Sequence, residues 1–271
     1  MKKTVIGMAG VFILLSGSVA MANQAQIITD EFYSVGNEYD LFGNNLGGFN
    51  AASQNLGVKT YQTPDGQIDS SALGRLLRIR DLDNNVDLFS NTNAAGEEMT
   101  FVLSGVDDVL WNPGADSATL YSLGLNIKLY SDTPGNFDAT NPATASDGTL
   151  VLDMKGHTQT VSATAGFDTT LGTTYDLKEN FDYGTGRYTG SAILDVIGGS
   201  WATLWDTNME NDGSDLAFSF SLDEINTTVG QFDLSGTANG VGNPVPEPAT
   251  MLLFGAGLIG LAGVSRRKLR K

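Results

Sequence analysis

Cysteine is absent from the 271 residues, and histidine occurs once, as His157. A chain without cysteine forms no disulfide and offers no thiol nucleophile or thiolate ligand for a metal. A single histidine also excludes a zinc site built from several imidazoles. The fold must therefore be held by its hydrophobic core, and the body of the chain is long enough to form one.

Basic residues are scarce in the body of the chain. Of the 15 Lys and Arg, two lie in residues 1–22 and five in residues 245–271, whereas 30 of the 31 Asp and Glu lie between these segments. The body therefore carries a net charge of about −22. Such a surface repels phosphates, which excludes nucleic acid as a partner. Divalent cations, cationic groups and neutral sugars remain compatible with it.

No interior segment shows a sustained apolar stripe at helical spacing. Short alternating runs, such as residues 158–163 and 188–197, lie between stretches rich in Gly, Asn, Asp, Ser and Thr. Alternation with a period of two indicates half-buried strands. Residues 73–83 fit a helix or a strand, and we interpret them as a strand with Leu77 and Ile79 on one face. The pattern predicts an all-β protein, folded as a single β-sandwich or jelly-roll-like domain of a dozen or so strands.

The N-terminal segment has the layout of a signal peptide. Two lysines precede an apolar run that extends from about Val5 to Leu15, and Ala20 and Ala22 supply the small residues of an A-x-A site. Cleavage after Ala22 places the mature N-terminus at Asn23. The body that follows is therefore expected to be exported by the cell.

The C-terminal segment combines a rigid strip, an apolar run and a cluster of cations. Residues 251–264 would form roughly 21 Å of helix, which is shorter than the usual ~30 Å span and requires local thinning of the bilayer. Pro246 and Pro248 hold the preceding strip extended, which is the conformation that a protease accepts. By the positive-inside rule, a basic stop-transfer cluster stays in the cytoplasm. It consists of Arg266, Arg267, Lys268, Arg270 and Lys271.

Pro246, Glu247 and Pro248, followed by a Gly-rich apolar run and an Arg-rich end, resemble the PEP-CTERM sorting signal. That signal occurs on exported proteins of Gram-negative bacteria that make exopolysaccharide. The resemblance implies cleavage near the motif by exosortase, a membrane-embedded cysteine transpeptidase or protease. The alternative is a single-span anchor without processing.

These segments divide the chain into four parts. We expect a signal peptide at residues 1–22, an all-β domain at 23–238, a flexible linker at 239–244 and a sorting signal at 245–271. The last part contains a transmembrane segment at 251–264 and a cytoplasmic tail at 265–271.

A second resemblance covers roughly residues 191–235. Gly198 and Gly199 follow a predicted strand, and an aromatic-Asp-Thr-Asn stretch begins at Trp205. This arrangement is similar to that of PEP-CTERM proteins linked to floc and biofilm formation. The similarity implies cell aggregation through the exopolysaccharide matrix and not an enzymatic reaction.

Two acidic stretches are candidate Ca²⁺ loops because they place oxygen ligands at alternate positions. The first consists of Asp81, Asp83, Asn85 and Asp87, and the second of Asp206, Asn208, Glu210 and Asp212. In the first stretch, Val86 and Thr92 stand where an EF-hand has Gly and Glu. The alternatives are an Asx turn for the first stretch and a solvated loop for the second.

The aromatic and titratable residues suggest binding and not catalysis. Trp201 and Trp205 flank a turn, where they could stack on sugar rings, although core packing is the alternative. His157 is interpreted as a surface histidine, because the chain has no G-x-S-x-G motif to accompany it. No pair of carboxylates carries a glycosidase motif. We therefore predict no catalytic residue.

The sequence predicts an exported, non-enzymatic surface or matrix protein associated with exopolysaccharide, floc or biofilm. The alternatives are a carbohydrate-binding or adhesive module with Ca²⁺-ordered loops and a secreted enzyme that acts on polysaccharide. Expected partners are signal peptidase and exosortase during processing, the membrane transiently through residues 251–264, and exopolysaccharide. No cofactor is expected apart from Ca²⁺. The predicted route runs through an inner-membrane intermediate to the cell surface or extracellular matrix.

Overall fold

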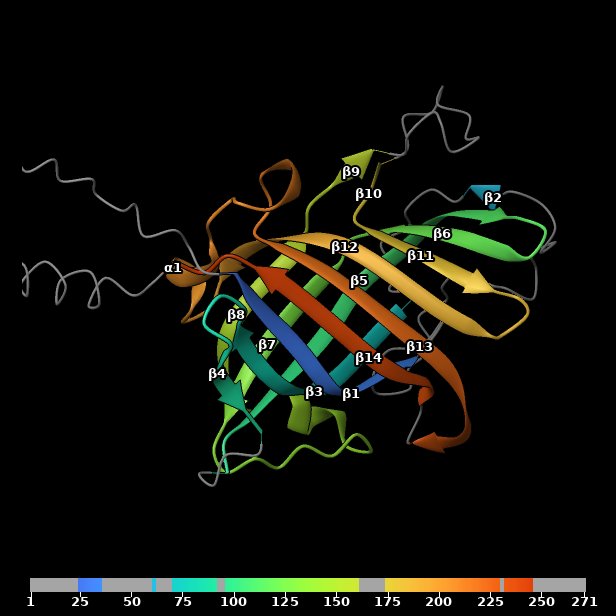
Figure 1. Ribbon diagram of the computed structural model, residues 1–271. Coiled ribbons are helices and arrows are strands. Elements are labelled where there is room, and N and C mark those ends of the chain that lie inside the picture. The colour runs from blue at the N-terminus through green and yellow to red at the C-terminus, as the bar shows by residue number, and fades with distance from the viewer. Residues whose placement is uncertain are drawn as a thin grey trace, which may run out of the picture.

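The computed structural model describes residues 24–35, 60–61, 70–91, 96–160, 174–229 and 232–245 (Figure 1). The predicted signal peptide, with its site at Ala20, Ala22 and Asn23, lies outside these residues, as do the Pro-Glu-Pro strip and everything after it. Within the described ranges, no helix is long and apolar enough to cross a membrane.

Strands dominate the described chain. The strands are β1 (Ala25–Val35), β2 (Thr60–Tyr61), β3 (Ser70–Asp81), β4 (Val86–Ser90), β5 (Glu98–Pro113), β6 (Ser117–Leu123), β7 (Asn126–Asp132), β8 (Thr149–Gly156), β9 (Gln159–Thr160), β10 (Thr174–Tyr175), β11 (Leu177–Asp182), β12 (Arg187–Gly198), β13 (Leu216–Val229) and β14 (Phe232–Gly242). The helical turns are η2 (Pro142–Ala145), α1 (Ala202–Trp205) and η5 (Asn211–Gly213). The all-β prediction is confirmed.

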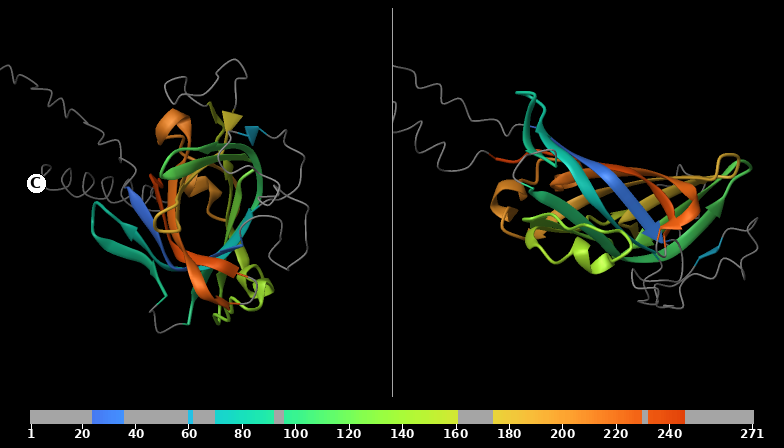
Figure 2. Two further views of the ribbon diagram at one scale, coloured as in Figure 1. Left: turned by 90° about the vertical axis from the view of Figure 1, so that its right-hand side faces the viewer. Right: turned by 90° about the horizontal axis from the view of Figure 1, so that it is seen from below.

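Twelve of these strands form one antiparallel sheet that closes on itself, while β9 and β10 pair separately. The ring runs β5, β7, β8, β12, β13, β14, β1, β3 and returns to β5, because β3 pairs with both β1 and β5. Viewed along its axis, the ring is evident (Figure 2). The strands therefore do not form the two stacked sheets of the expected sandwich. Bulges in β1 and β3 bend and twist these strands, which helps the sheet to close.

The long strands β5 and β12 extend the ring toward one end. The first part of β5 pairs with β7 and its last part with β6. Likewise, the last part of β12 pairs with β8 and its first part with β11. Since β6 and β11 also pair with each other, they take the places of β7 and β8 at this end.

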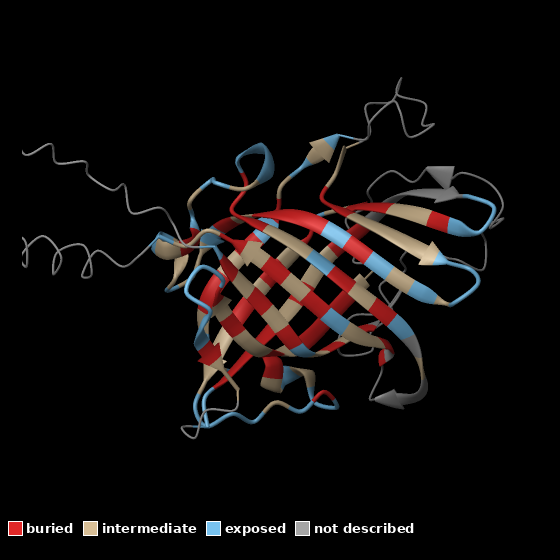
Figure 3. Cartoon of the chain, viewed as in Figure 1, coloured by how far each residue is buried: buried red, intermediate tan, exposed pale blue. Residues whose placement is uncertain are grey.

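Inward and outward residues alternate along the strands (Figure 3). In β3 the alternation shifts at Leu77, which has no partner on β1 because the register jumps there. As a result, Leu76 and Ile79 are both buried, at 1% exposure each, while Leu77 is half-buried. The strand prediction for this segment is confirmed, but the inward residue is Leu76 and not Leu77.

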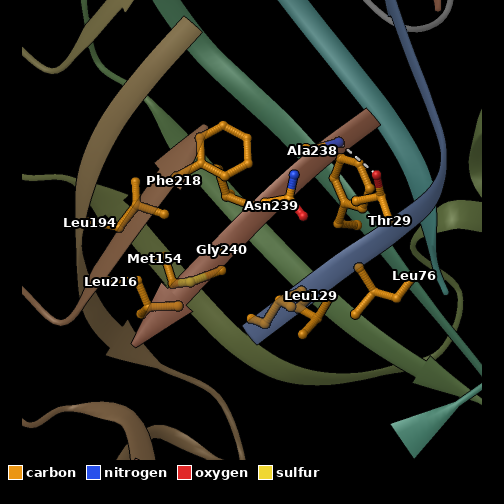
Figure 4. Close-up of a pocket in the computed structure, with 13 residues that line it drawn as sticks. Thr29, Leu76, Leu129, Met154, Leu194, Leu216, Phe218, Ala238, Asn239 and Gly240 are labelled. Carbon is orange, nitrogen blue, oxygen red and sulfur yellow. Dashed lines mark hydrogen bonds between the residues drawn. The ribbon is translucent and has the colours of Figure 1, made fainter. Parts of the chain in front are cut away.

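Apolar side chains fill the interior of the ring. The rings of Phe32, Phe101 and Phe220 meet there, with centroids 5.4 and 5.5 Å apart for the two pairs that include Phe32. Gly190 on β12 makes room for Phe220, because a Cβ atom at this position would overlap the aromatic ring. A cavity of about 40 Å³ lies in the interior and is lined mostly by apolar residues (Figure 4). Its volume is well below that of a small-molecule site, so the described interior around it is a packed core.

A second, smaller core lies where the connection between β7 and β8 packs on the sheet. Leu73 and Phe232 are fully buried beneath Ala139 and Ala145 of this connection. Glu98 fixes it in place, because its Oε1 accepts hydrogen bonds from the backbone N–H groups of residues 136 and 137.

The predicted linker at residues 239–244 is wrong. Residues 239–242 belong to β14 and pair with both β13 and β1. The repeated glycines that suggested flexibility fit a closed sheet instead: Gly240 lies against Ile27 and Gly242 against Leu216 and Trp205. The folded body therefore extends through β14, and no spacer separates it from the C-terminal segment.

Candidate functional site

Both ends of the described body lie at the same end of the closed sheet. Ala25 at the start of β1 pairs with Gly242 at the end of β14 and with Asp81 at the end of β3. The first and last described residues, Gln24 and Val245, therefore belong to this side of the body. We call this the terminal end: residues 24 and 243–245, the turn 82–85, α1 and the loop 206–215.

Hydrogen bonds hold the chain at its exit from the body. The Val245 N–H donates to the Leu204 carbonyl at 2.8 Å, and the Asn243 side-chain amide donates to Glu210 Oε1 at 2.5 Å. The chain is thus fixed as far as the residue that precedes Pro246.

The first candidate loop is a tight hairpin turn between β3 and β4. One oxygen of Asp81 accepts from the backbone N–H groups of Asp83, at 2.9 Å, and Asn84, at 3.0 Å. Its other oxygen accepts from the Asn84 side-chain amide at 2.8 Å. Asn85 has φ 54°, the left-handed conformation that asparagine tolerates in turns. This is the pattern of an Asx turn.

The other carboxylates of this hairpin have different partners. Asp83 Oδ2 accepts from the Gln24 backbone N–H at 3.1 Å, which joins the hairpin to the start of the body. Asp87 accepts from Arg80 Nε at 2.8 Å, and this hydrogen bond is the main cause that holds the pKa of Asp87 below its usual range. Within the described ranges, no group of three or more acidic, His or Cys residues could hold a metal ion. The hydrogen bonds therefore favour the Asx turn over the Ca²⁺ site that the spacing predicts.

The second candidate loop is wound around Asp215, which is only 2% exposed. Its Oδ1 accepts from the backbone N–H groups of Thr207 and Asn208, both at 2.6 Å. Its Oδ2 accepts from the Val196 N–H at 2.7 Å. Charge-assisted hydrogen bonds of this length are strong ones. Asp215 therefore joins the loop to β12, next to the point where β13 begins.

The four predicted ligands of this loop do not converge on one point. Asp206 Oδ1 accepts from the Asn208 side-chain amide at 3.1 Å, and Glu210 accepts from Asn243. Asp212 is exposed and has a left-handed φ of 57°. Sequence reasoning placed Asp215 at the end of the acidic stretch but did not predict its organising role, because its burial depends on strands distant in sequence. The one local signal was its place directly before the alternating strand that begins at Leu216.

The two tryptophans of the terminal end serve the core. Trp205 is 3% exposed and packs close to Gly242, so its ring offers no face to a sugar, and the predicted stacking role of Trp205 is wrong. Trp201 is half-buried against the same core, and its backbone N–H donates to the Val151 carbonyl at 2.9 Å. Stacking by Trp201 stays a prediction. Gly199, with φ +98° and close contact to Val151, allows β12 to turn into α1.

His157 is half-buried and has a partner that the sequence did not reveal. Its Nδ1 lies 2.7 Å from Asp195 Oδ1 on β12. The two residues are 38 positions apart, so only the sheet pairing brings them together. A histidine with an aspartate is two thirds of a Ser-His-Asp triad, which would further require a serine hydroxyl at Nε2.

Comparison with known proteins identifies the C-terminal segment. Residues 244–268 match the family of the PEP-CTERM protein-sorting motif. The chain thus carries a PEP-CTERM sorting motif, which implies export, a membrane-anchored sorting intermediate and processing by exosortase. The match begins at Pro244, within the residues fixed at the terminal end. No curated protein and no solved structure matches the chain.

Proposed function

We propose that this protein is delivered by exosortase to the cell surface or extracellular matrix, where it associates with exopolysaccharide and contributes to floc or biofilm formation without catalysing a reaction. One observation carries the proposal: the sorting motif begins at Pro244, where the closed sheet ends. The C-terminal segment directs the sorting of the protein, and the all-β body is the part that reaches the cell surface or matrix.

The charge of the body supports this role. A net charge of about −22 keeps an exported protein soluble and repels other polyanions. Neutral polysaccharide carries no such repulsion. The similarity of residues 191–235 to floc-associated PEP-CTERM proteins supports the same role.

Because the folded body extends through β14, only a short stretch of chain separates it from the predicted membrane segment. Only five residues lie between Val245 and Met251, where the predicted membrane segment begins, and the six steps from one to the other reach roughly 20 Å at full extension. In the membrane-anchored intermediate, the terminal end therefore lies close to the bilayer. Exosortase acts on a strip directly beside the folded body.

The test uses the full chain expressed in a host that contains exosortase and in the same host without it. Intact mass of the surface material should lack Arg266 to Lys271 only when exosortase is present. The protein should cosediment with the host's exopolysaccharide and release no reducing ends from it. A processed protein that remains in solution beside the polysaccharide would refute the matrix role, and release of reducing ends would make the protein an enzyme.

A further inference from the structure

A groove of about 340 Å³ lies on the outer face of the closed sheet, across β12, β13 and β14. Gln159 and Tyr175, from the separate pair β9–β10, border it on one side, and Asn211 borders it from the loop 206–215. The pair and the loop both rise above β12 at the top of Figure 1. This volume falls in the range of small-molecule binding sites, in contrast to the packed interior.

The floor of the groove consists of two rows of side chains that cross the three strands in register. One row is polar: Ser191, Ser219 and Asn239. The next row is apolar: Ile193, Ala217 and Val241. Hydroxyl and amide groups both donate and accept hydrogen bonds, so the polar row can serve either role. A polar row beside an apolar row suits a ligand with hydroxyls along one edge and C–H groups on its face.

The aromatic wall is held in a fixed orientation. The ring of Tyr175 packs edge-on against Tyr121, with centroids 4.9 Å apart, and its hydroxyl lies 3.4 Å from Gln159 Oε1. Tyr175 is half-exposed, so part of its ring is available to a ligand. A fixed, half-exposed aromatic ring is a platform for the C–H face of a sugar.

Among the residues that the structure describes, none that lines the groove is charged, although the body carries about −22. Charges lie just beyond it: Lys178 pairs with Ser191 from the neighbouring strand, and Asp195 follows Ile193 as the next outward residue of β12. The Asp195 carboxylate is occupied by His157. An anionic ligand would find no cation in the lining to pair with, and a neutral ligand needs none.

We propose that this groove binds a segment of neutral saccharide. The assignment rests on the proposed association with exopolysaccharide and names the face of the body that would carry it. It differs from the stacking role predicted for Trp201 and Trp205, because neither tryptophan lines the groove.

The experiment uses the full chain in detergent micelles, titrated by calorimetry with cellohexaose, chitohexaose and the anionic hexagalacturonate. Ser191→Ile places a branched side chain on the exposed floor of the groove. Thr189→Ile is the matched control, because Thr189 is also exposed on β12, faces the same side and lies outside the lining. Asn239→Leu replaces the amide by an apolar group with the same number and branching of heavy atoms. Thermal unfolding verifies that each variant is folded.

We expect a neutral hexasaccharide to bind, Ser191→Ile and Asn239→Leu to weaken binding about tenfold or more, and Thr189→Ile to leave it within about twofold. Equal binding by all variants would overturn the groove assignment. So would binding of hexagalacturonate alone, or of neither class of oligosaccharide.

A cosedimentation assay with the host's exopolysaccharide separates this failure from that of the proposed function. If the protein binds the polymer but the groove variants bind it equally well, the association stands and the groove does not. If the protein does not bind the polymer, the proposed function fails as well.

Discussion

Two carboxylates toward opposite ends of the closed sheet, the buried Asp215 and the half-buried Glu179, are held in opposite ways. At the terminal end, Asp215 accepts three short hydrogen bonds from backbone N–H groups of two segments. Toward the other end, Glu179 on β11 lies between Leu120 on β6 and Gly190 on β12. Burial alone acts on its ionisation and raises the pKa of Glu179 to about 7.

The two carboxylates differ because the backbone groups around them differ in whether they already have hydrogen-bond partners. The terminal end contains irregular loops, whose backbone N–H groups need acceptors, and a charged carboxylate satisfies several at once. In β11 and its neighbours the backbone groups already pair with one another, so a carboxylate there finds an apolar interior and is disfavoured when charged. Asp215 therefore fixes the segment beside the sorting motif, whereas Glu179 lowers the stability of the folded protein near neutral pH.

The largest expected effect comes from Asp215→Ala. The substitution leaves three backbone N–H groups without their acceptor, and each costs about 1–3 kcal/mol when buried. We expect the free energy of unfolding to fall by about 3–5 kcal/mol, measured by urea denaturation. Asp212→Asn in the same loop is the control, because Asp212 is exposed and asparagine tolerates its left-handed φ, and it should change the value by less than about 0.5 kcal/mol. Similar losses from both variants would show that Asp215 has no special role.

The second prediction concerns Glu179→Gln. The pKa of Glu179 is higher in the folded protein, at about 7, than in the unfolded chain, where it lies near 4.5. Between these values the folded state binds more protons, so its stability falls as pH rises through the window and levels off above it. The variant lacks this loss. We expect the free energy of unfolding of the wild type to fall by about 2 kcal/mol across this pH window. This is less than the full pKa shift would give, because Glu179 keeps some exposure to solvent.

The measurement is the difference in unfolding free energy between wild type and Glu179→Gln, at several pH values from 4 to 8. Taking the difference removes the contributions of other acids, such as Asp223, whose pKa is lowered mainly by its hydrogen bond from Arg187. A difference that does not change across this range would contradict the raised pKa.

The third prediction tests the hairpin of the terminal end. Asp81 is 8% exposed and accepts three hydrogen bonds within its own turn, so Asp81→Ala should cost about 1–2 kcal/mol. This is less than for Asp215, because the turn is short and water can reach its N–H groups. Asp83→Ala removes only an exposed contact to Gln24 and should cost about 0.5 kcal/mol or less. If Asp83→Ala were the more damaging of the two, the turn would not depend on Asp81.

The sequence predicted the local features of this fold better than its long-range ones. Alternation predicted the strands, and the Asp-rich stretch at residues 81–87 has the Asx turn that was its alternative reading. Closure of the sheet depends on β3 pairing with both β1 and β5, which no local pattern encodes. The glycines of β14 suggested a linker because their role, close packing against Ile27 and Trp205, exists only in the folded sheet.

The candidate site shows the same division. The sorting motif is a contiguous string and was found from sequence, and the match at residues 244–268 confirms it. The partnership of His157 with Asp195, the burial of Trp205 and the role of Asp215 all depend on strands that meet across the sheet. Spacing alone therefore predicted a metal site in the second acidic stretch and did not predict that Asp215 organises the loop through hydrogen bonds.

The smallest expected effect is that of Ca²⁺ on the two acidic loops, compared with NaCl at matched ionic strength. The sequence predicted specific binding. In the structure, however, Asp81 and Asp87 are already occupied by backbone donors and Arg80. Any stabilisation should then come from screening of the body's negative charge, which both salts provide, and the two shifts in melting temperature should agree within about 1 °C.

The metal site would be restored if Ca²⁺ gave a larger shift than NaCl and Asp83→Ala abolished the excess. The control Asp168→Ala, outside both loops, should then retain it. Binding at about 100 times Kd would add roughly 2.7 kcal/mol, several degrees for a domain of this size, so the two outcomes are well separated.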